Sequence, residues 1–382
     1  MKSTESSTPR IVFAVCCAGM ATVSFIAAVP AVTLTTIASE LGMSFSMKGI
    51  FLSASFWGLT LAMLVSGPLA DRWGFRFILT LSGVLESAGL LVVSRATSPA
   101  AAIVGGILLG MGAGISDALL TPVVCALFPD KRTQMSNLLH AFYSIGLIVS
   151  ISLMLGLMHL RIGWRGIYVV FSLIALPYGI VMFVLPLPRP AHEKGVKVRL
   201  SAILGKGGFL LFLAAIFLGG VTELGPSTWL PNFVEQAQGA KAQGATGLLV
   251  FGAAMALGRL SISLVVRKMG VRRLFLIASL LCAVSLLLAA LAVSTFFTIL
   301  WLGVLAFSVA VFWPTILARA GDRFPKAGAS MFSLLSAFGA FGGVVGPMVI
   351  GFIAEAYDLR VAMAGLAVAP LVVLLLMLRA PE

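Results

Sequence analysis

Long apolar runs without a single charge constrain this chain more than any other feature. Leu274–Trp301 and Val361–Leu378, for example, contain no Lys, Arg, Asp or Glu. Runs of about 18 or more such residues are typical of membrane-spanning helices. Lipid cannot hydrogen-bond to the backbone, so only helices or a closed barrel can span a membrane. The runs are continuous rather than alternating, which predicts an all-α membrane protein.

The composition agrees with a chain embedded in a lipid bilayer. Only 10% of its residues are charged and its mean hydropathy is +1.10, whereas soluble proteins carry about 25% charged residues. The net charge of +13 does not indicate nucleic acid as a partner, because the basic residues lie in short loops between apolar runs. The four cysteines lie inside apolar runs, without the spacing of a disulfide framework or a metal site, so we expect no metal.

The breaks between runs predict twelve membrane-spanning helices. Their approximate ranges are 11–38, 48–68, 76–94, 99–128, 133–158, 165–187, 206–232, 243–265, 273–294, 297–319, 326–353 and 361–379. If the N-terminus is inside, most of the 26 Lys and Arg residues fall on the inner side, so the positive-inside rule predicts that both termini are cytoplasmic. The absence of an Asn-x-Ser/Thr acceptor is consistent with a bacterial inner (plasma) membrane.

Several residues of the first half recur at one constant spacing in the second half. The matched pairs include Pro30 with Pro226, Gly74 with Gly270, Phe128 with Phe324, and Gly146 with Gly342. This predicts two six-helix pseudo-repeats, an architecture in which substrate binds between the halves near the bilayer midplane. We expect an N-terminal half at 1–187, a cytoplasmic linker at 188–205 and a C-terminal half at 206–382.

A glycine-rich, charged motif joins the second and third predicted spans. It reads Gly67-Pro68-Leu69-Ala70-Asp71-Arg72-Trp73-Gly74-Phe75-Arg76. We expect Gly67 to allow close helix approach and Gly74 to allow a tight reversal. Asp71 can cap a helix or pair with an arginine. Arg72 and Arg76 complete a polar gate at the inner surface.

This motif resembles the major facilitator signature, Gly-x-x-x-Asp-Arg-x-Gly-x-Arg/Lys. The resemblance implies a secondary transporter that works by alternating access and needs no cofactor. The second copy of the motif has Arg267 in the place of Asp71, so we expect an asymmetric gate. The chain has no phosphate-binding loop and no hydrolase motif, so we do not expect an enzyme.

Five ionisable residues fall within predicted spans, where charge is costly and usually functional. They are Glu86, Asp117, His140, Glu223 and Arg259. Asp117 lies about 18 Å from the inner end of its span, so we expect it to be a proton-coupling acid. Glu223 lies toward the outer end of its span and is a second coupling candidate. The alternatives are that it closes an outer gate, binds substrate or forms a structural pair. We expect structural roles for Arg259, which would pair with an acid or carbonyls, and for Glu86.

Four further stretches are similar to the fucose-permease-like (fucose–galactose–glucose:proton symporter) branch of this superfamily. They are Gly110–Asp117, Asn137–Gly146, Glu223–Pro231 and Gly258-Arg259. The resemblance implies that Asp117 is the proton-linked acid and that Asn137 contacts a sugar. The chain departs from the branch because its first span contains no acid, and Glu40 lies at the outer end of that span.

Further residues are candidates for contact with substrate. Asn137 and His140 share a helix face, where they either bind a sugar hydroxyl or fix the fifth span against the fourth. The remaining candidates are Phe25, Tyr143, Trp229, Asn232 and Trp313. We also expect Pro30, Pro122, Pro226 and Pro314 to break four inner helices.

Two transport hypotheses follow. The first is proton-coupled symport of a sugar or similar small polar solute by a monomer. The alternative is a proton-driven exporter of drugs or metabolites, since Gly342-Gly343-Val344-Val345-Gly346-Pro347 resembles an element of such antiporters. A receptor or scaffold that moves no solute is a third possibility, and the lack of any sizeable soluble domain argues against it.

Overall fold

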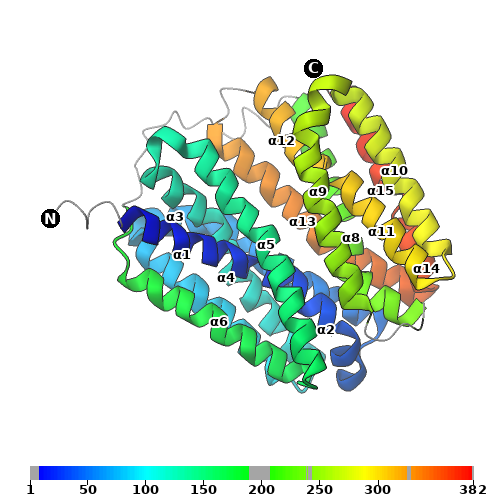
Figure 1. Cartoon of the computed structure of the whole chain (residues 1–382), viewed down its shortest axis with the longest axis horizontal. Coiled ribbons are helices and arrows are strands. Elements are labelled where there is room, and N and C mark those ends of the chain that lie inside the picture. The colour runs from blue at the N-terminus through cyan, green and yellow to red at the C-terminus, as the bar shows by residue number, and fades with distance from the viewer. Residues whose placement is uncertain (1–7, 189–206, 238, 240–242, 325–327, 381–382) are drawn as a thin grey trace. The chain divides into compact units, whose positions relative to one another are not determined.

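The computed structural model describes residues 8–188, 207–237, 239, 243–324 and 328–380. The side chains of residues 8, 132–134, 137, 207, 237, 262–268 and 328–330 are not described. All but the first residue of the predicted linker, 188–205, also lies outside the described residues. Within the described residues every regular element is a helix (Figure 1).

The first half of the chain forms helices α1 to α6, and the second half forms α8 to α15. The first set is α1 Thr8–Val23, α2 Phe25–Leu41, α3 Phe45–Ser94, α4 Pro99–Leu127, the short 3-10 helix η1 Pro129–Lys131, α5 Arg132–His159 and α6 Trp164–Val184. The second set is α8 Gly207–Ala237, α9 Gly244–Met269, α10 Val271–Leu291, α11 Thr295–Val309, α12 Phe312–Arg323, α13 Gly328–Ala356, α14 Leu359–Gly365 and α15 Val368–Arg379.

Eleven helical stretches of the described residues are long and apolar enough to cross a membrane. One of them, Phe45–Ser94, covers two predicted spans, 48–68 and 76–94. The backbone leaves the helical conformation inside it at Gly74, where φ is 82° and ψ is 155°. Because this residue divides α3 into two spans, the structure accounts for all twelve predicted spans and confirms the all-α membrane fold.

The chain divides into two compact units. Unit 1 comprises Met1–Ile37 and Ala54–Lys194, and unit 2 comprises Ala38–Ser53 and Gly195–Glu382. The division follows the two predicted halves except for one segment. Ala38–Ser53, which joins the first two predicted spans, packs with the helices of unit 2.

Backbone and side-chain contacts hold this segment in unit 2. The backbone N–H of Ser46, in the first turn of α3, donates to Glu355 Oε2 at 3.0 Å. A carboxylate at a helix N-terminus satisfies a free N–H and complements the helix dipole. The hydroxyl of Ser53 donates to the carbonyl of Val344 at 2.7 Å. Gly49 lies so close to α13 that an added Cβ would be 2.7 Å from a carbonyl oxygen.

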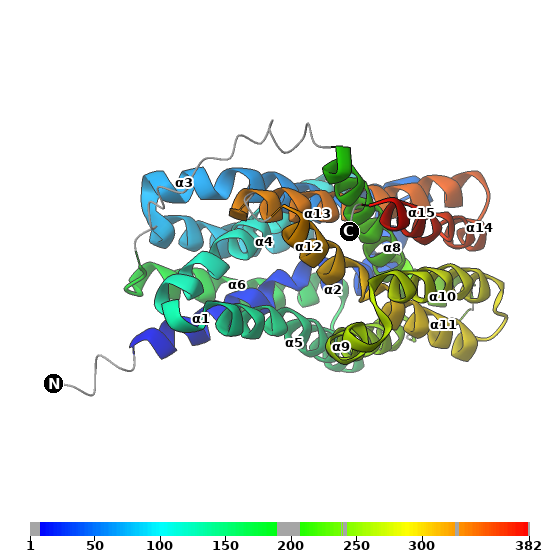
Figure 2. The same cartoon turned by 90° about the horizontal axis from the view of Figure 1, so that it is seen from above.

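Within each unit, one helix is surrounded by several others. In unit 1, α1 packs against α4, α5 and α6 (Figures 1 and 2). In unit 2, α8 packs against α13, α15, α9 and α12. Without water to exclude, membrane helices gain stability from close packing at small residues. Gly146 on α5, for example, faces α1 where a Cβ would lie 2.6 Å from the Cα of Ala21.

The prolines break the inner helices at fewer positions than the sequence predicts. Helix α4 continues through Pro122 and α8 continues through Pro226, so these two expected breaks are wrong. Membrane helices tolerate proline because neighbouring helices and local adjustments satisfy the freed carbonyls. Interruptions do occur near the other two prolines: α1 ends before Ser24, ahead of Pro30, and α11 ends at Val309, ahead of Pro314.

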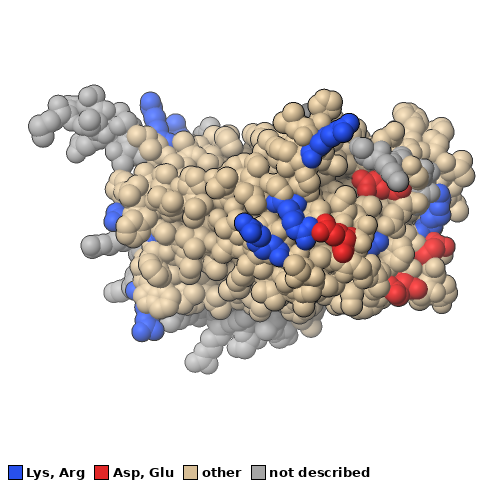
Figure 3. Space-filling view, turned by 90° about the horizontal axis from the view of Figure 1, so that it is seen from below, with Lys and Arg blue, Asp and Glu red and all other residues tan. Residues whose placement is uncertain are grey.

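The surface of the described residues is largely uncharged. Figure 3 shows wide areas without Lys, Arg, Asp or Glu on the face in view. Large apolar side chains are exposed along several helices, such as Leu260 and Leu291, whose exposed fractions are 71% and 73%. Such a surface is expected of helices that face lipid rather than water.

Candidate functional site

A run of small residues fixes helix α4 against α3 just before Asp117. Gly110 and Gly114 face the backbone of Ser55 and Leu59 on α3, with no room for a Cβ. At Gly112 an added Cβ would lie 2.6 Å from Cγ of Glu86. The glycines therefore let the two helix backbones approach closely, and this contact sets the position of the residues that follow on α4.

Asp117 lies on a half-buried face of α4. Asp117, Thr121 and Cys125 follow one another at intervals of four residues, which places them on one helix face. All three are half-buried, whereas Ser116 and Leu120 beside them are buried. Asp117 is therefore only partly covered by its neighbours, and its predicted role as a group that exchanges protons stays a prediction.

Helix α5 brings His140 to the same face. The hydroxyl of Thr121 and Nε2 of His140 form a hydrogen bond of 3.0 Å. Asp117 interacts electrostatically with the His140 ring. The structure thus places the predicted acid and the predicted histidine together, from helices α4 and α5 of unit 1. Thr121 was not predicted, although its position four residues after Asp117 is a signal that indicates a shared face.

The other predicted residues on α5 lie near this cluster along the helix. Asn137 is one turn before His140, and its side chain is not described. Tyr143 follows His140 by three residues and is half-buried. Asn137 as a sugar contact therefore stays a prediction.

Unit 2 contains an ion pair between two predicted residues. Arg259 Nη2 on α9 lies 3.2 Å from Glu223 Oε1 on α8. The Arg259 side chain is 38% exposed and that of Glu223 is 11% exposed. The sequence predicts that Arg259 pairs with an acid or with carbonyls, and the structure shows that its partner is Glu223.

Two predicted substrate contacts are packed inside unit 2. Trp229 is fully buried, donates from Nε1 to the carbonyl of Pro347 at 3.0 Å and stacks with Phe45 at a ring-centroid distance of 6.2 Å. Asn232 is also fully buried. Neither side chain is open to a solute in this structure. Trp313 on α12 is half-buried, with its ring against Gly339 of α13.

One predicted feature of the signature motif is visible in the backbone. Gly74 adopts a positive φ of 82°, as a tight reversal requires. Among the described residues nothing lies within 4 Å of a Cβ added at Gly67, so the close helix approach expected there stays a prediction. Asp71, Arg72 and Arg76 are exposed. Within the described part of the chain, Asp71 forms no ion pair, so its role in a gate stays a prediction.

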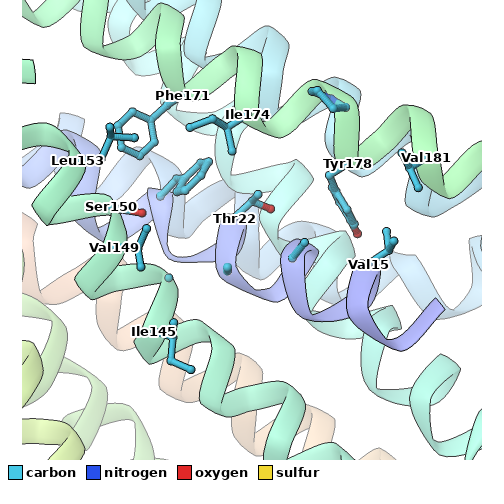
Figure 4. A pocket seen from close by; sticks show the side chains of 15 residues that line it. Val15, Thr22, Ile145, Val149, Ser150, Leu153, Phe171, Ile174, Tyr178 and Val181 are labelled. Atoms are coloured by element: carbon cyan, nitrogen blue, oxygen red, sulfur yellow. The ribbon is translucent and has the colours of Figure 1, made fainter. Parts of the chain in front are cut away.

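A groove of about 430 Å³ opens within unit 1 between α1, α2, α5 and α6 (Figure 4). Most of its walls are aliphatic or aromatic, including Phe25 on α2. The hydroxyls of Thr22, Ser150 and Tyr178 are its only polar side-chain groups among the described residues. Of the predicted substrate contacts, Phe25 alone lines this groove, and it packs edge-on against Phe171 at a centroid distance of 4.8 Å.

The chemistry of these groups fits proton exchange better than bond making. Among the described residues, no three His, Cys, Asp or Glu side chains gather in a way that would hold a metal ion. Asp117 and His140 are both ionisable side chains, and ionisable groups within membrane spans are costly and usually functional.

Comparisons with known proteins place the chain in a family. The model of the Major Facilitator Superfamily matches residues 11–270 and 244–382. The purine ribonucleoside efflux pump NepI of Salmonella paratyphi B is 27% identical over 349 residues, which cover 88% of this chain and 85% of NepI.

Two solved structures share the fold. The nucleoside transporter NupG is 14% identical with a TM-score of 0.76, over 97% of this chain and 98% of NupG. The xylose transporter XylE from E. coli is 13% identical with a TM-score of 0.79, over 98% of this chain and 100% of XylE. The chain is therefore an integral membrane protein that belongs to the Major Facilitator Superfamily, a family of transporters of small molecules rather than enzymes.

Proposed function

We propose that this protein is a proton-coupled secondary transporter of a small polar solute of the nucleoside or sugar class. The observation that carries the proposal is the cluster of Asp117, Thr121 and His140 on α4 and α5. Coupling to protons requires a group that alternates between two protonation states during the cycle. Asp117 is half-buried, lies near mid-span and has a titratable neighbour rather than a permanent cation.

Asp117 has two forms, the carboxylate and the neutral acid. The carboxylate and the neutral acid differ in charge and in hydrogen bonding, so hydration and neighbouring groups affect the two forms differently. A solute or a change in hydration near Asp117 therefore shifts the balance between the two forms. This is the physical link that makes proton binding and solute binding depend on each other.

The similarity to NepI supports a nucleoside as the solute and export as the direction. NepI is named as a purine ribonucleoside efflux pump, and the match covers most of both chains. An exporter driven by protons exchanges one solute molecule for incoming protons. In such an exporter, Asp117 binds a proton when the solute leaves.

The second candidate is symport of a sugar-like solute. It is favoured by Asp117 together with Asn137 and His140, which resemble the pattern of the fucose-permease-like branch. A nucleoside contains a ribose ring, so a site built for sugar hydroxyls suits either solute class. The two candidates differ in the direction of the solute relative to the proton.

The sign of the proton gradient that drives accumulation distinguishes the two candidates. Purified protein is reconstituted into proteoliposomes, and uptake of radiolabelled inosine, adenosine, xylose and fucose is measured. Symport predicts accumulation when the outside is acidic, and antiport predicts accumulation when the vesicle interior is acidic. Both predictions hold whichever way the protein is inserted, because they depend only on thermodynamics.

The variant Asp117→Asn tests the proposed acid. It keeps the size of the side chain but cannot exchange a proton. We expect it to lose gradient-driven accumulation while it keeps solute exchange. The control is Asp130→Asn, the same change at an exposed position in η1. Gradient-driven accumulation that survives in Asp117→Asn contradicts the proposed role, and the absence of flux for every solute contradicts the proposed substrate class.

A further inference from the structure

Glu86 lies at the centre of a polar cluster that the transport proposal does not use. It is fully buried on α3 in unit 1. Hydroxyl groups surround it: Ser82 from its own helix, Ser116 from α4, Tyr178 from α6 and Thr22 from α1. The cluster therefore joins four helices at one point inside unit 1.

Most hydrogens of these hydroxyls are already used elsewhere. Each serine or threonine hydroxyl has one hydrogen to donate. The hydroxyl of Ser82 donates to the carbonyl of Leu79 at 2.7 Å. The hydroxyl of Thr22 donates to the carbonyl of Gly19 at 2.9 Å. Neither of them has a hydrogen left for Glu86.

Ser116 is a poor partner for a carboxylate at this position. Its hydroxyl lies 3.0 Å from Ser82 Oγ and 3.4 Å from Glu86 Oε1, so its one hydrogen has two competing acceptors. The longer distance exceeds that of an ordinary O–H···O hydrogen bond. Tyr178 is 3.2 Å from Ser116 and reaches the carboxyl only through it. Glu86 Oε2 has no hydrogen-bond partner within the described residues.

Among the described side chains, no cation lies where it would compensate a charge on Glu86. The other titratable groups that face this cluster from the surrounding helices are Cys16 on α1 and Tyr178 on α6, and neither carries positive charge. Asp117 follows Ser116 in sequence but lies on the half-buried face of α4. A buried carboxylate needs a counter-ion or several strong donors, and the described residues provide neither.

We propose that Glu86 is held as a neutral carboxylic acid and acts as a positioning residue for Asp117. The hydroxyl oxygen of Thr22 lies within interaction range of the carboxyl and has unused lone pairs that can accept from the O–H of a neutral acid. Oε1 lies 3.4 Å from the hydroxyl of Ser116. The acid thereby ties α3 to α1 and α4, and the α4 contact is the residue directly before Asp117.

The position of the groove agrees with this arrangement. Thr22 and Tyr178 line the groove in unit 1 and also touch the cluster, whereas Glu86 is not among the lining residues (Figure 4). A solvent molecule or lipid chain in the groove therefore meets hydroxyl groups before it reaches the acid. The ring of Tyr178 packs against Gly19, where an added Cβ would be 2.5 Å from Cζ, so α6 closes the cluster tightly.

The variant Glu86→Gln distinguishes a neutral acid from a carboxylate. A glutamine amide donates and accepts as a protonated acid does, but it cannot ionise. We expect Glu86→Gln to keep the thermal stability of the purified protein and the pH dependence of solute transport. Infrared spectra in lipid membranes at neutral pH should lose one protonated-carboxyl band in Glu86→Gln. The control Glu40→Gln, at an exposed position, should lose none.

The variant Glu86→Ala measures the positioning role, which rests on the proposed proton coupling through Asp117. We expect a lower melting temperature and a shifted pH profile of transport, with Glu86→Gln restoring both. If Glu86→Gln abolishes gradient-driven accumulation, Glu86 itself exchanges protons and the proposal is overturned. An unchanged protonated-carboxyl band in Glu86→Gln also overturns it. The infrared and melting measurements need no transport, so they stand even if the proposed function fails.

Discussion

Glu223 and Arg259 form an ion pair of 3.2 Å in unit 2, whereas Asp117 in unit 1 has the imidazole of His140 as its neighbour. Arginine stays protonated under all physiological conditions, so the neighbour of Glu223 is a permanent cation. The two predicted coupling acids thus have different surroundings, and the surroundings of Asp117 are the ones that favour proton exchange.

The first prediction concerns the ion pair. Glu223→Gln leaves the Arg259 guanidinium without its partner and should lower the free energy of unfolding by about 1–3 kcal/mol. This is less than for a fully buried pair because Arg259 is 38% exposed. Melting of the purified protein in detergent measures the loss. The double variant Glu223→Gln with Arg259→Met should recover most of it, and a single variant as stable as the wild type contradicts the pair's structural role.

The second prediction concerns the segment of the first half that packs in unit 2. At Gly49 a Cβ would lie 2.7 Å from the Pro347 carbonyl oxygen and 3.1 Å from Cα of Gly351. Gly49→Ala therefore forces α3 and α13 apart and should destabilise the protein by about 1–3 kcal/mol, as overpacking does. Gly67→Ala is the matched control, because none of the described residues lies within 4 Å of its Cβ. Equal melting temperatures for the two variants would mean that the α3–α13 contact contributes nothing to stability.

The third prediction concerns the hydrogen bond between Thr121 and His140. Thr121→Val keeps the shape of the side chain but removes the hydroxyl that holds the imidazole at 3.0 Å. Loss of one such bond should reduce the rate of gradient-driven transport about threefold to tenfold. The variant should still accumulate solute, unlike Asp117→Asn. Serine at this position, which keeps a hydroxyl, should preserve most of the rate, and a serine variant as impaired as the valine variant excludes the hydrogen bond as the cause.

Much of the fold could be predicted because charged residues mark the ends of membrane helices in the sequence. Charge-free runs predict spans, and two glycines at matching positions of the repeat predict the same backbone conformation at those positions. Gly74 has φ 82° and ψ 155°, and Gly270 has φ 73° and ψ 154°. A positive φ of this kind is costly for residues with a Cβ, so glycine at both positions carries structural information.

Other features depend on packing that the sequence does not reveal. The assignment of Ala38–Ser53 to unit 2 arises from contacts with residues such as Val344 and Glu355, far away in the chain. The burial of Trp229 likewise depends on α13, which supplies its hydrogen-bond acceptor. Aromatic residues in an apolar span look alike in sequence whether they face a cavity, lipid or another helix.

Only part of the candidate site could be predicted, because the sequence does not reveal which side chains of different helices meet. Asp117 and His140 stand out because ionisable residues are rare within spans, and the structure brings them together. Thr121 and Tyr178 do not stand out, because a hydroxyl in a membrane helix often satisfies a backbone carbonyl of its own helix. Ser53, for example, donates to the carbonyl of Gly49 as well as to α13.

The proposed function requires Asp117 to couple solute movement to protons. The most direct measurement is gradient-driven accumulation of inosine in proteoliposomes that contain the wild type or Asp117→Asn, with solute exchange measured in the same vesicles. We predict that the wild type concentrates the solute when the vesicle interior is acidic, while Asp117→Asn exchanges the solute but does not concentrate it. Equal accumulation by the two proteins would contradict the account.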